Sequence, residues 1–257
     1  MRALVYYVIG GAPDYAQLLR ASVASLRKHH AAVEVDVAVL CDADYARHVH
    51  CIDGVRVLQT PPNGDDPVSA SMRKMQAFRW VPDIRAYDVV LYLDCDTLVL
   101  GRLDEVLRGV SAPDKLYTCR EEGPDGHTRG YWSLGRYTQQ QLEGMRRDGV
   151  GTFNCGQFAF KPTPEMEAHF AAVCRLTEED VDRRGFWEQA YANHHFNASR
   201  AVDDTVLTPC VLLAARKPPA PPGVVIAHFT DASMPWWLKF QCMMEWSGEQ
   251  RDANFRM

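Results

Sequence analysis

The sequence VVLYLDCDT, residues 89–97, places two aspartates directly after five consecutive apolar residues. A run this short, with no polar alternation, is typical of a strand that is covered on both faces. Asp94 and Asp96 are one residue apart, so a turn at this point brings both carboxylates to one divalent ion. Two buried acids this close are costly without a cation, and magnesium and manganese prefer oxygen ligands. We therefore interpret the pair as a metal site; the alternative is a solvated turn or a helix cap.

Strand and helix patterns alternate along the chain before this stretch. In order, they predict a strand over Ala3–Ile9, a helix capped by Asp14, strands over Val33–Leu40 and Val55–Leu58, and a helix over Ser69–Trp80. This order predicts an α/β fold, with an open, mainly parallel, twisted sheet flanked by helices. Ligands of such sheets bind beyond the carboxyl ends of the strands, where Gly10-Gly11 and Asp94-Cys95-Asp96 lie.

The pattern after residue 100 is less regular. The polar, glycine-bearing segment Arg120–Arg136 is a candidate active-site flap. The remaining expected elements are a strand over Phe158–Phe160, helical stretches within Glu165–Leu176 and Glu178–His195, and a buried strand over Val224–Ala227 that runs into His228. The sequence contains no internal repeat that would indicate a solenoid.

Composition and charge narrow the class of protein. The chain has 257 residues and a formal net charge of −5, which argues against non-specific binding of nucleic acid. No apolar run approaches the roughly 18 residues that a membrane span requires. The apolar start leads into Gly10-Gly11 rather than a cleavage site, so we interpret it as a strand and not as a secretory signal. The eight cysteines form no CxxC pair, which favours reduced thiols in a cytoplasmic protein.

The stretch LYLDCDTLVLGRLDEVL, residues 91–107, resembles the Asp-x-Asp region of glycogenin and its relatives, the family 8 retaining glycosyltransferases. The resemblance implies a GT-A fold in a single domain over residues 1–257. Residues 1–100 would form a Rossmann-like nucleotide-binding half that ends in the Asp-x-Asp motif, and residues 101–257 an acceptor half. It also implies that Asp94 and Asp96 hold Mn²⁺, or Mg²⁺, bound to the diphosphate of a nucleotide sugar.

The same short motif resembles the nucleophile motif of haloacid-dehalogenase-type phosphatases. In that interpretation Asp94 is the nucleophile, and Asp203-Asp204 is the distal acidic pair. The phosphatase motif usually ends the first strand of the core, whereas three strand patterns precede it here. The depth of the motif in the chain therefore favours the glycosyltransferase.

Two further segments resemble the donor-binding part of the glycosyltransferase family. IGGAPDYAQLLRASVASL, residues 9–26, is similar to its nucleotide-binding opening. By this resemblance Tyr15 stacks on uracil, and the backbone of Ile9, Gly10 and Gly11 meets the base or ribose. Lys74, in SMRKMQAFRW, matches a lysine that reaches the donor. The alternatives are a core contact for Tyr15 and a solvated helix face for Lys74.

Two later segments resemble the sugar-binding part of the family. FNCGQF, residues 153–158, is similar to an FNSG-type segment, in which Asn154 bonds sugar or acceptor hydroxyls and Gly156 permits a close backbone approach. Glu188-Gln189, followed by Asn193, resembles an Asp-Gln-x-x-Leu-Asn helix, with glutamate in place of aspartate. The resemblance implies that Glu188, Gln189 and Asn154 form the catalytic set that orients or stabilises the reacting sugar.

The end of the chain contains the third expected metal ligand. VIAHF, residues 225–229, resembles the start of a His-Phe-x-Gly-x-x-Lys-Pro-Trp segment, in which His228 binds the metal. Met234 stands where the family has a lysine that binds the diphosphate. Lys239 and Arg73 are candidates to replace that lysine. Cys95 lies between the two aspartates among the donor-binding residues, and we expect its thiol to pack inward.

Together these features predict a metal-dependent retaining glycosyltransferase. It moves a sugar from a nucleotide-diphosphosugar, with a UDP-sugar favoured, to a hydroxyl of a saccharide, lipid or protein acceptor. In the mechanism that the resemblance implies, the acceptor attacks from the face that the diphosphate leaves, and the departing phosphate takes the proton. Two alternatives stay open: a phosphatase that uses Asp94, and a catalytically weak sugar-nucleotide-binding protein, which Met234 motivates.

Overall fold

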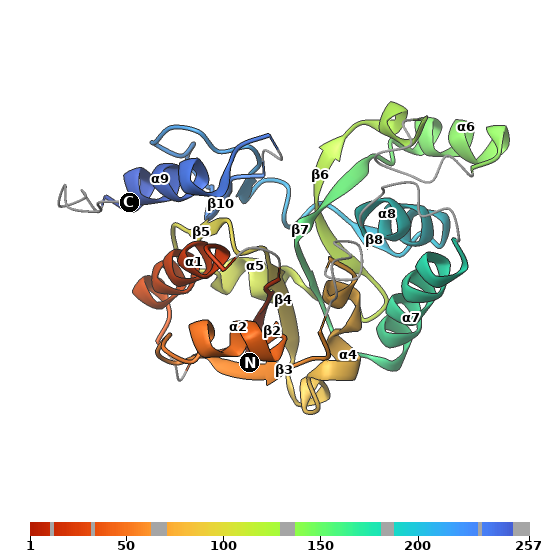
Figure 1. Cartoon of the computed structure of the whole chain (residues 1–257). Helices are drawn as coiled ribbons and strands as arrows, with labels where there is room; N and C mark the ends of the chain where they lie inside the picture. Colours follow the sequence, from red (N-terminus) through yellow and green to blue (C-terminus); the bar gives the residue numbers. More distant parts are fainter. Residues whose placement is uncertain are drawn as a thin grey trace.

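Two sheets organise the chain in the computed structural model (Figure 1), which describes residues 1–10, 13–31, 34–62, 71–128, 137–180, 188–230 and 233–248. The larger sheet has the strand order β3-β2-β1-β4-β7-β6-β8, and the smaller one β5-β10-β9. The strands of the larger sheet are β1 (Ala3–Val8), β2 (Val35–Cys41), β3 (Arg56–Gln59), β4 (Val89–Leu93), β6 (Leu116–Glu122), β7 (Thr152–Phe160) and β8 (Val202–Asp203). Those of the smaller sheet are β5 (Thr97–Val99), β9 (Val211–Leu212) and β10 (Ile226–His228).

The larger sheet is parallel over its first half, as the order of strands and helices in the sequence predicts. β1 pairs in parallel with β2 and β4, and β2 pairs in parallel with β3. β7 runs antiparallel to both β4 and β6, so the sheet is mixed beyond β4. The reversal brings the middle of β7 to the carboxyl end of β4, where the Asp94 N–H donates to the Gly156 carbonyl at 2.7 Å.

β4 is buried on both faces, as its unbroken apolar sequence predicts. Its alternate side chains enter two different core clusters. One cluster includes α1 (Tyr15–His29), α2 (Ala43–Val49) and α5 (Asp104–Gly109); the other includes α7 (Pro164–Glu179) and α8 (Glu188–Ala198). Figure 1 shows α1 and α2 on one side of the strands and α7 and α8 on the other. The sheet thus has a helical layer on each face.

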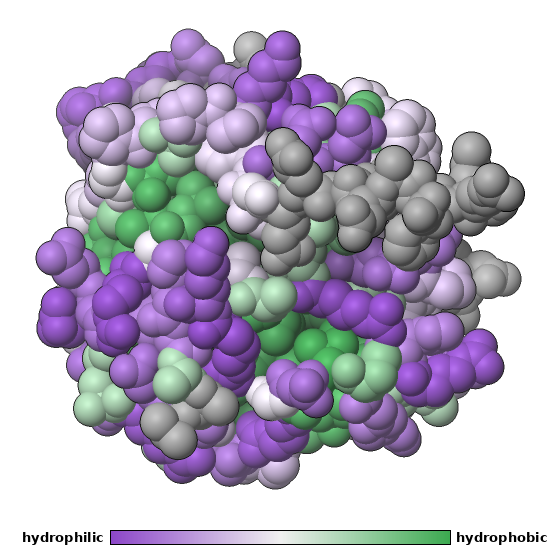
Figure 2. All heavy atoms as spheres, turned by 90° about the vertical axis from the view of Figure 1, so that its left-hand side faces the viewer, coloured by the Kyte–Doolittle hydropathy of each residue, from purple (hydrophilic) through white to green (hydrophobic). Residues whose placement is uncertain are grey.

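The last described helix, α9 (Trp236–Ser247), packs on α1. The other helices are α4 (Ala77–Trp80) and α6 (Gln139–Asp148), with the 3₁₀ turns η1 (Arg73–Gln76), η2 (Ile84–Ala86) and η3 (Pro124–Thr128). Figure 2 shows the face of the molecule that lies at the left of Figure 1, where hydrophilic side chains surround patches of apolar ones. Within the described ranges, no helix is long and apolar enough to cross a membrane.

The helix predicted over Ser69–Trp80 is interrupted in its described part, residues 71–80, because the 3₁₀ turn η1 lies between the helical residues 71–72 and α4. The Tyr6 hydroxyl donates to the Lys74 carbonyl, in η1, at 2.7 Å. The ammonium group of Lys74 lies 3.0 Å from Asp94 Oδ1, at the carboxyl end of β4.

Two other expectations need correction, and one is confirmed. The segment Arg120–Arg136 is not one irregular flap, because β6 continues to Glu122 and η3 follows; residues 129–136 lie outside the described residues. The segment Glu178–His195 contains helical stretches, as expected: the end of α7 at Glu179 and α8 from Glu188, with residues 181–187 outside the described residues. Asp14 precedes α1, but its side chain makes no capping hydrogen bond.

Candidate metal centre and its surroundings

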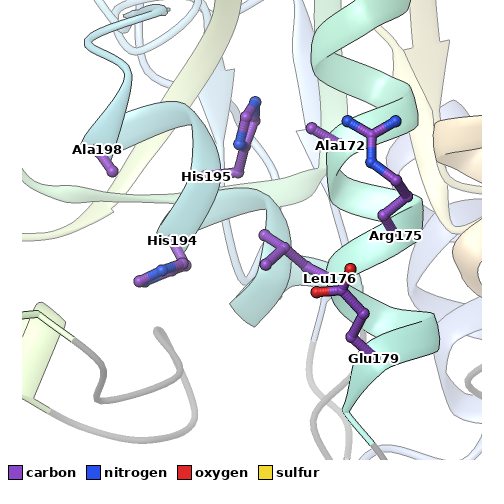
Figure 3. A pocket seen from close by; sticks show the side chains of 7 residues that line it. All are labelled: Ala172, Arg175, Leu176, Glu179, His194, His195 and Ala198. Carbon is purple, nitrogen blue, oxygen red and sulfur yellow. The ribbon is translucent and has the colours of Figure 1, made fainter.

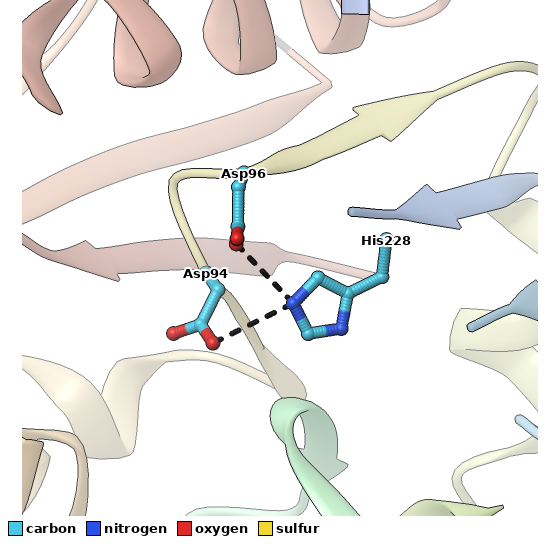
Figure 4. A group of neighbouring side chains, drawn as sticks. All are labelled: Asp94, Asp96 and His228. Carbon is cyan, nitrogen blue, oxygen red and sulfur yellow. Dashed lines mark ion pairs between the residues drawn. The ribbon is translucent and has the colours of Figure 1, made fainter. Parts of the chain in front are cut away.

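The structure brings together the three predicted metal ligands, Asp94, Asp96 and His228 (Figure 4). His228 Nε2 lies 3.2 Å from Asp96 Oδ1 and 3.7 Å from Asp94 Oδ2. One ligand atom from each residue falls within 4.8 Å of the others. Two carboxylate oxygens and one imidazole nitrogen form a donor set that fits a divalent ion of the manganese type.

Strand pairing explains why His228 meets residues far from it in the sequence. β10 runs antiparallel to β5, with His228 opposite Thr97. The Phe229 N–H donates to the Asp96 carbonyl at 2.9 Å, which extends this pairing into the aspartate loop. Asp94 and Asp96 lie between β4 and β5, so the loop joins the two sheets. The three candidate metal ligands therefore come together where the larger and the smaller sheet meet.

Gly156 gives the imidazole ring of His228 the space it occupies. A Cβ atom at position 156 would lie 2.0 Å from His228 Cε1, and 2.8 Å from both Asp94 Oδ2 and Asn154 Oδ1. Contacts under 3.0 Å are essentially never made by real Cβ atoms. The sequence predicts a close backbone approach at Gly156, and the structure shows that the approaching group is the histidine ring.

Two lysines neutralise the outer sides of the aspartates. Lys74 Nζ lies 3.0 Å from Asp94 Oδ1 and 2.6 Å from Glu188 Oε1, and Lys239 Nζ lies 2.6 Å from Asp96 Oδ2. Burial lowers the pKa of Lys74, but Asp94 and Glu188 outweigh burial and raise that pKa well above its ordinary value. Burial likewise opposes ionisation of Asp96, but His228 and Lys239 hold the pKa of its carboxyl well below the usual range. Lys74 is thus a buried ion-pair residue and not a solvated one.

Two of the predicted catalytic side chains, Asn154 and Gln189, lie beside these ion pairs. Both donate to one carboxylate that the sequence did not reveal. Asn154 Nδ2 and Gln189 Nε2 both donate to Glu121 Oε2, at 3.1 Å and 2.9 Å. Asn154 Oδ1 accepts from the Gly156 N–H at 2.7 Å, and Gln189 Oε1 from the Cys155 N–H at 2.9 Å. Both amides are therefore held in one orientation. Glu121 lies at the end of β6, in the segment we expected to be a flap, and no motif marks it.

Glu188 is 3% exposed at the start of α8. Its Oε1 accepts from Lys74, whereas Oε2 is buried and has no hydrogen-bond partner among the described residues. Buried polar atoms are nearly always paired, so Oε2 of Glu188 could still accept a hydrogen bond.

Asn193 supports this arrangement from within α8. Its Oδ1 accepts from the Phe153 N–H at 2.9 Å, and its Nδ2 donates to the Phe153 and Gln189 carbonyls at 2.8 Å and 3.0 Å. The side chain is fully buried. The spacing from Gln189 to Asn193 thus serves to fasten α8 to β7.

The residues expected to meet the nucleotide lie near the carboxyl end of β1. Tyr15 is 36% exposed at the start of α1, as a stacking surface requires. Ile9 is buried, and its N–H donates to Leu40, so the carbonyl is the backbone group it has left to offer. Gly10 is half-buried, and Gly11 lies outside the described residues. Cys95 turns its thiol inward to the Val8 carbonyl at 3.4 Å, as expected.

The contacts of Arg73 and of Asp203-Asp204 do not favour the roles considered for them, as the replacement lysine and as a phosphatase acid pair. Arg73 donates to the Pro61 carbonyl and makes no described contact with either aspartate, so Lys239 is the better candidate to supply the missing charge. Asp203 and Asp204 bond to Thr205 and Arg120 rather than to the Asp94 group. The second acidic site that a phosphatase needs is therefore not formed by this pair.

A shallow pocket of about 260 Å³ lies between α7 and α8 (Figure 3). It is lined by Ala172, Arg175, Leu176, Glu179, His194, His195 and Ala198. None of the predicted site residues is among them. We therefore treat the pocket as separate from the metal centre.

Comparison with known proteins gives a clear result at the level of structure alone. No protein-family model and no curated protein matches the sequence. A structure of the galactosyltransferase LgtC in complex with donor and acceptor sugar analogs is 18% identical, with a TM-score of 0.60 over 92% of this chain and 89% of that chain. A structure of an active-site mutant of LgtC is 16% identical, with a TM-score of 0.62 over 96% of this chain and 95% of that chain.

A third solved structure, the glycosyltransferase GlyE of Streptococcus pneumoniae TIGR4, is 17% identical. Its TM-score is 0.57 over 96% of this chain and 63% of that chain. At identities this low the likeness concerns the arrangement of the backbone. The chain therefore has the GT-A fold of these glycosyltransferases, with a mostly parallel central sheet flanked by helices.

Proposed function

We propose that this protein is a family 8-like retaining glycosyltransferase, which uses Mn²⁺ or Mg²⁺ to transfer a sugar from a nucleotide-diphosphosugar, with a UDP-sugar favoured, to an acceptor hydroxyl. The observation that carries the proposal is the meeting of Asp94, Asp96 and His228 in a fold shared with LgtC. LgtC was crystallised with donor and acceptor sugar analogs, which supports a sugar donor and a sugar acceptor here.

The residues around the candidate metal centre suit charge stabilisation. A divalent ion bound by Asp94, Asp96 and His228 would neutralise the negative charge that grows on a departing diphosphate. Lys74 and Lys239 would orient the two aspartates through ion pairs with Asp94 Oδ1 and Asp96 Oδ2. In this proposal the first hundred residues bind the nucleotide, and the later part of one domain binds sugar and acceptor.

The sugar-orienting residues are the second part of the proposal. Glu188 Oε2 is buried and has no partner among the described residues, and it would accept a hydrogen bond from a hydroxyl of the transferred sugar. Asn154 and Gln189 are already fixed by Glu121, so they would meet the sugar without reorganising. Attack from the face of the leaving diphosphate would let that phosphate accept the proton, which requires no strong base from the protein.

The test is incubation of the protein with a panel of UDP- and GDP-sugars and Mn²⁺, with released nucleotide as the measurement. We expect slow donor hydrolysis that Asp96→Ala abolishes and that Asp203→Ala, a control outside the metal centre, retains. Release of phosphate from small phosphoesters, lost in Asp94→Ala, would favour the phosphatase instead. Donor binding without turnover would support a binding protein, and unchanged activity in His228→Ala would rule out the three-ligand centre.

A further inference from the structure

Each aspartate of the candidate metal centre has its two oxygens assigned to different partners. Asp94 Oδ2 and Asp96 Oδ1 turn toward His228 Nε2, at 3.7 Å and 3.2 Å. Asp94 Oδ1 turns to Lys74, at 3.0 Å, and Asp96 Oδ2 turns to Lys239, at 2.6 Å. The two oxygens that face His228, Asp94 Oδ2 and Asp96 Oδ1, are thus left for an ion. The other two oxygens face the ammonium groups of Lys74 and Lys239.

Lys239 occupies an unusual place for a lysine. It lies in α9, a helix rich in aromatic and aliphatic side chains, yet only Lys239 and Met243 among the residues of this helix are buried. Its partner Asp96 is 143 residues away in the sequence. Burying an ammonium group is costly unless a carboxylate compensates it. The ion pair with Asp96 therefore stabilises the orientation of α9 that buries Lys239.

We propose that Lys239 is a positioning residue that limits Asp96 to a single oxygen ligand and so selects a small octahedral ion over calcium. The proposal rests on the metal centre of the proposed function. Calcium takes six to eight oxygens at longer distances and often binds a carboxylate through both oxygens, whereas magnesium-sized ions demand near-octahedral geometry. With Lys239 on Oδ2, Asp96 offers one oxygen only.

Lys74 acts in the same way on Asp94, but it also binds Glu188 and so belongs to the proposed sugar site. Lys239 has one described carboxylate partner, Asp96, which makes it the cleaner residue to change. The residues that would hold the ion then offer two single oxygens and one imidazole nitrogen, which would leave ligand positions for water and for the oxygens of a diphosphate.

The experiment measures metal binding in the whole chain without any sugar nucleotide. Free Mn²⁺ is followed by its electron paramagnetic resonance signal, and Ca²⁺ is added as competitor to obtain the ratio of the two dissociation constants. Lys239→Met should lower the preference for Mn²⁺ over Ca²⁺ by about 10-fold, a change comparable to the losses of metal affinity seen when partners of metal ligands are removed. Lys239→Arg should retain the preference, and so should Lys115→Met, whose ammonium bonds to the Arg200 carbonyl on the surface.

Circular dichroism and thermal unfolding show whether each variant is folded, and Lys239→Gln replaces the methionine variant if that variant is not. An unchanged Mn²⁺/Ca²⁺ ratio in a folded neutral variant overturns the proposal, as does a wild-type chain that binds no Mn²⁺. If the preference for Mn²⁺ is lost in the folded Lys239 variant but the wild-type chain transfers no sugar, the role of Lys239 is supported and the proposed function alone is contradicted.

Discussion

At the scale of single residues, Gly156 shows how a missing side chain builds a site. We expect Gly156→Ala to lower the free energy of unfolding by about 1–3 kcal/mol, the usual cost of overpacking, and to weaken Mn²⁺ binding. The added Cβ would lie 2.0 Å from His228 Cε1 and 2.8 Å from Asp94 Oδ2, so the ring has to move. Urea unfolding and Mn²⁺ titration measure the two effects.

Gly123→Ala is the matched control for this substitution. A Cβ at position 123 would meet no atom within 4 Å, so the free energy of unfolding should change by no more than about 0.5 kcal/mol. If Gly156→Ala binds Mn²⁺ as tightly as the wild type, the prediction is wrong, because moving the ring of His228 would then have no effect on metal binding.

Glu121 gives a prediction about pH. Burial raises the pKa of Glu121 above its ordinary value of 4.5, although hydrogen bonds from Asn154 and Gln189 lower it. The folded chain therefore favours the protonated carboxyl more than the unfolded chain does. The stability that follows is fully present below the ordinary pKa and is lost as the pH rises through the raised pKa.

Glu121→Gln removes this titration. Relative to wild type, the free energy of unfolding of Glu121→Gln should therefore increase as the pH rises from about 4 to about 7. Urea unfolding of both proteins at several pH values measures the difference in their free energies of unfolding. The other titrating groups contribute equally to both proteins, so their contributions cancel in this difference. Glu143→Gln, on the exposed face of α6, is the control and should follow the wild type throughout. Parallel profiles for Glu121→Gln and wild type would contradict the prediction.

At the scale of elements, hydroxyl groups link the aspartate loop to β1 and α1. Thr97 Oγ1 donates to the Asp94 carbonyl at 2.8 Å and lies 3.1 Å from Ser22 Oγ, which in turn donates to the Tyr7 hydroxyl at 3.1 Å. All three side chains are fully buried. The loop between β4 and β5 thus has a support that comes from two other elements.

Thr97→Val should break this link with little change of shape. We expect a loss of about 1–2 kcal/mol in the free energy of unfolding, because the partly buried Asp94 carbonyl loses this donor, together with weaker Mn²⁺ binding. Thr118→Val is the control: Thr118 is as buried, and its hydroxyl has no partner among the described residues. It should be neutral or stabilising, and an equal loss in both variants would mean that the hydroxyl link has no role.

At the scale of the whole molecule, the candidate metal ligands come from the ends of two strands that lie in different sheets. An ion that binds them binds the folded chain and not the unfolded one. Mn²⁺ at 100 times its dissociation constant should therefore raise the free energy of unfolding by about 2.7 kcal/mol. Thermal unfolding with Mn²⁺ and with a chelator measures the shift. His228→Ala should abolish it, and the exposed His50→Ala should retain it.

Much of the fold could be predicted because it depends on local patterns. The apolar run of β4, the amphipathic face of α1 and the alternation of strands and helices are properties of neighbouring residues, and they indicated a parallel α/β sheet. The aspartate pair was visible for the same reason, since Asp94 and Asp96 are adjacent to one strand end. His228 required more, because only the resemblance to a family related it to the aspartates.

The tertiary structure alone decided which partners these residues have. The antiparallel entry of β7 sets Gly156 against His228, and the 3₁₀ turn η1 holds Lys74 within 3.0 Å of Asp94. Glu121 and Lys239 carry no motif, and their positions follow from strand order and helix packing over long separations in the chain. The sequence by itself determined the sheet and the pair of acids after β4. The tertiary structure decided the rest of the site, because a buried charge is costly unless the fold places an opposite charge beside it.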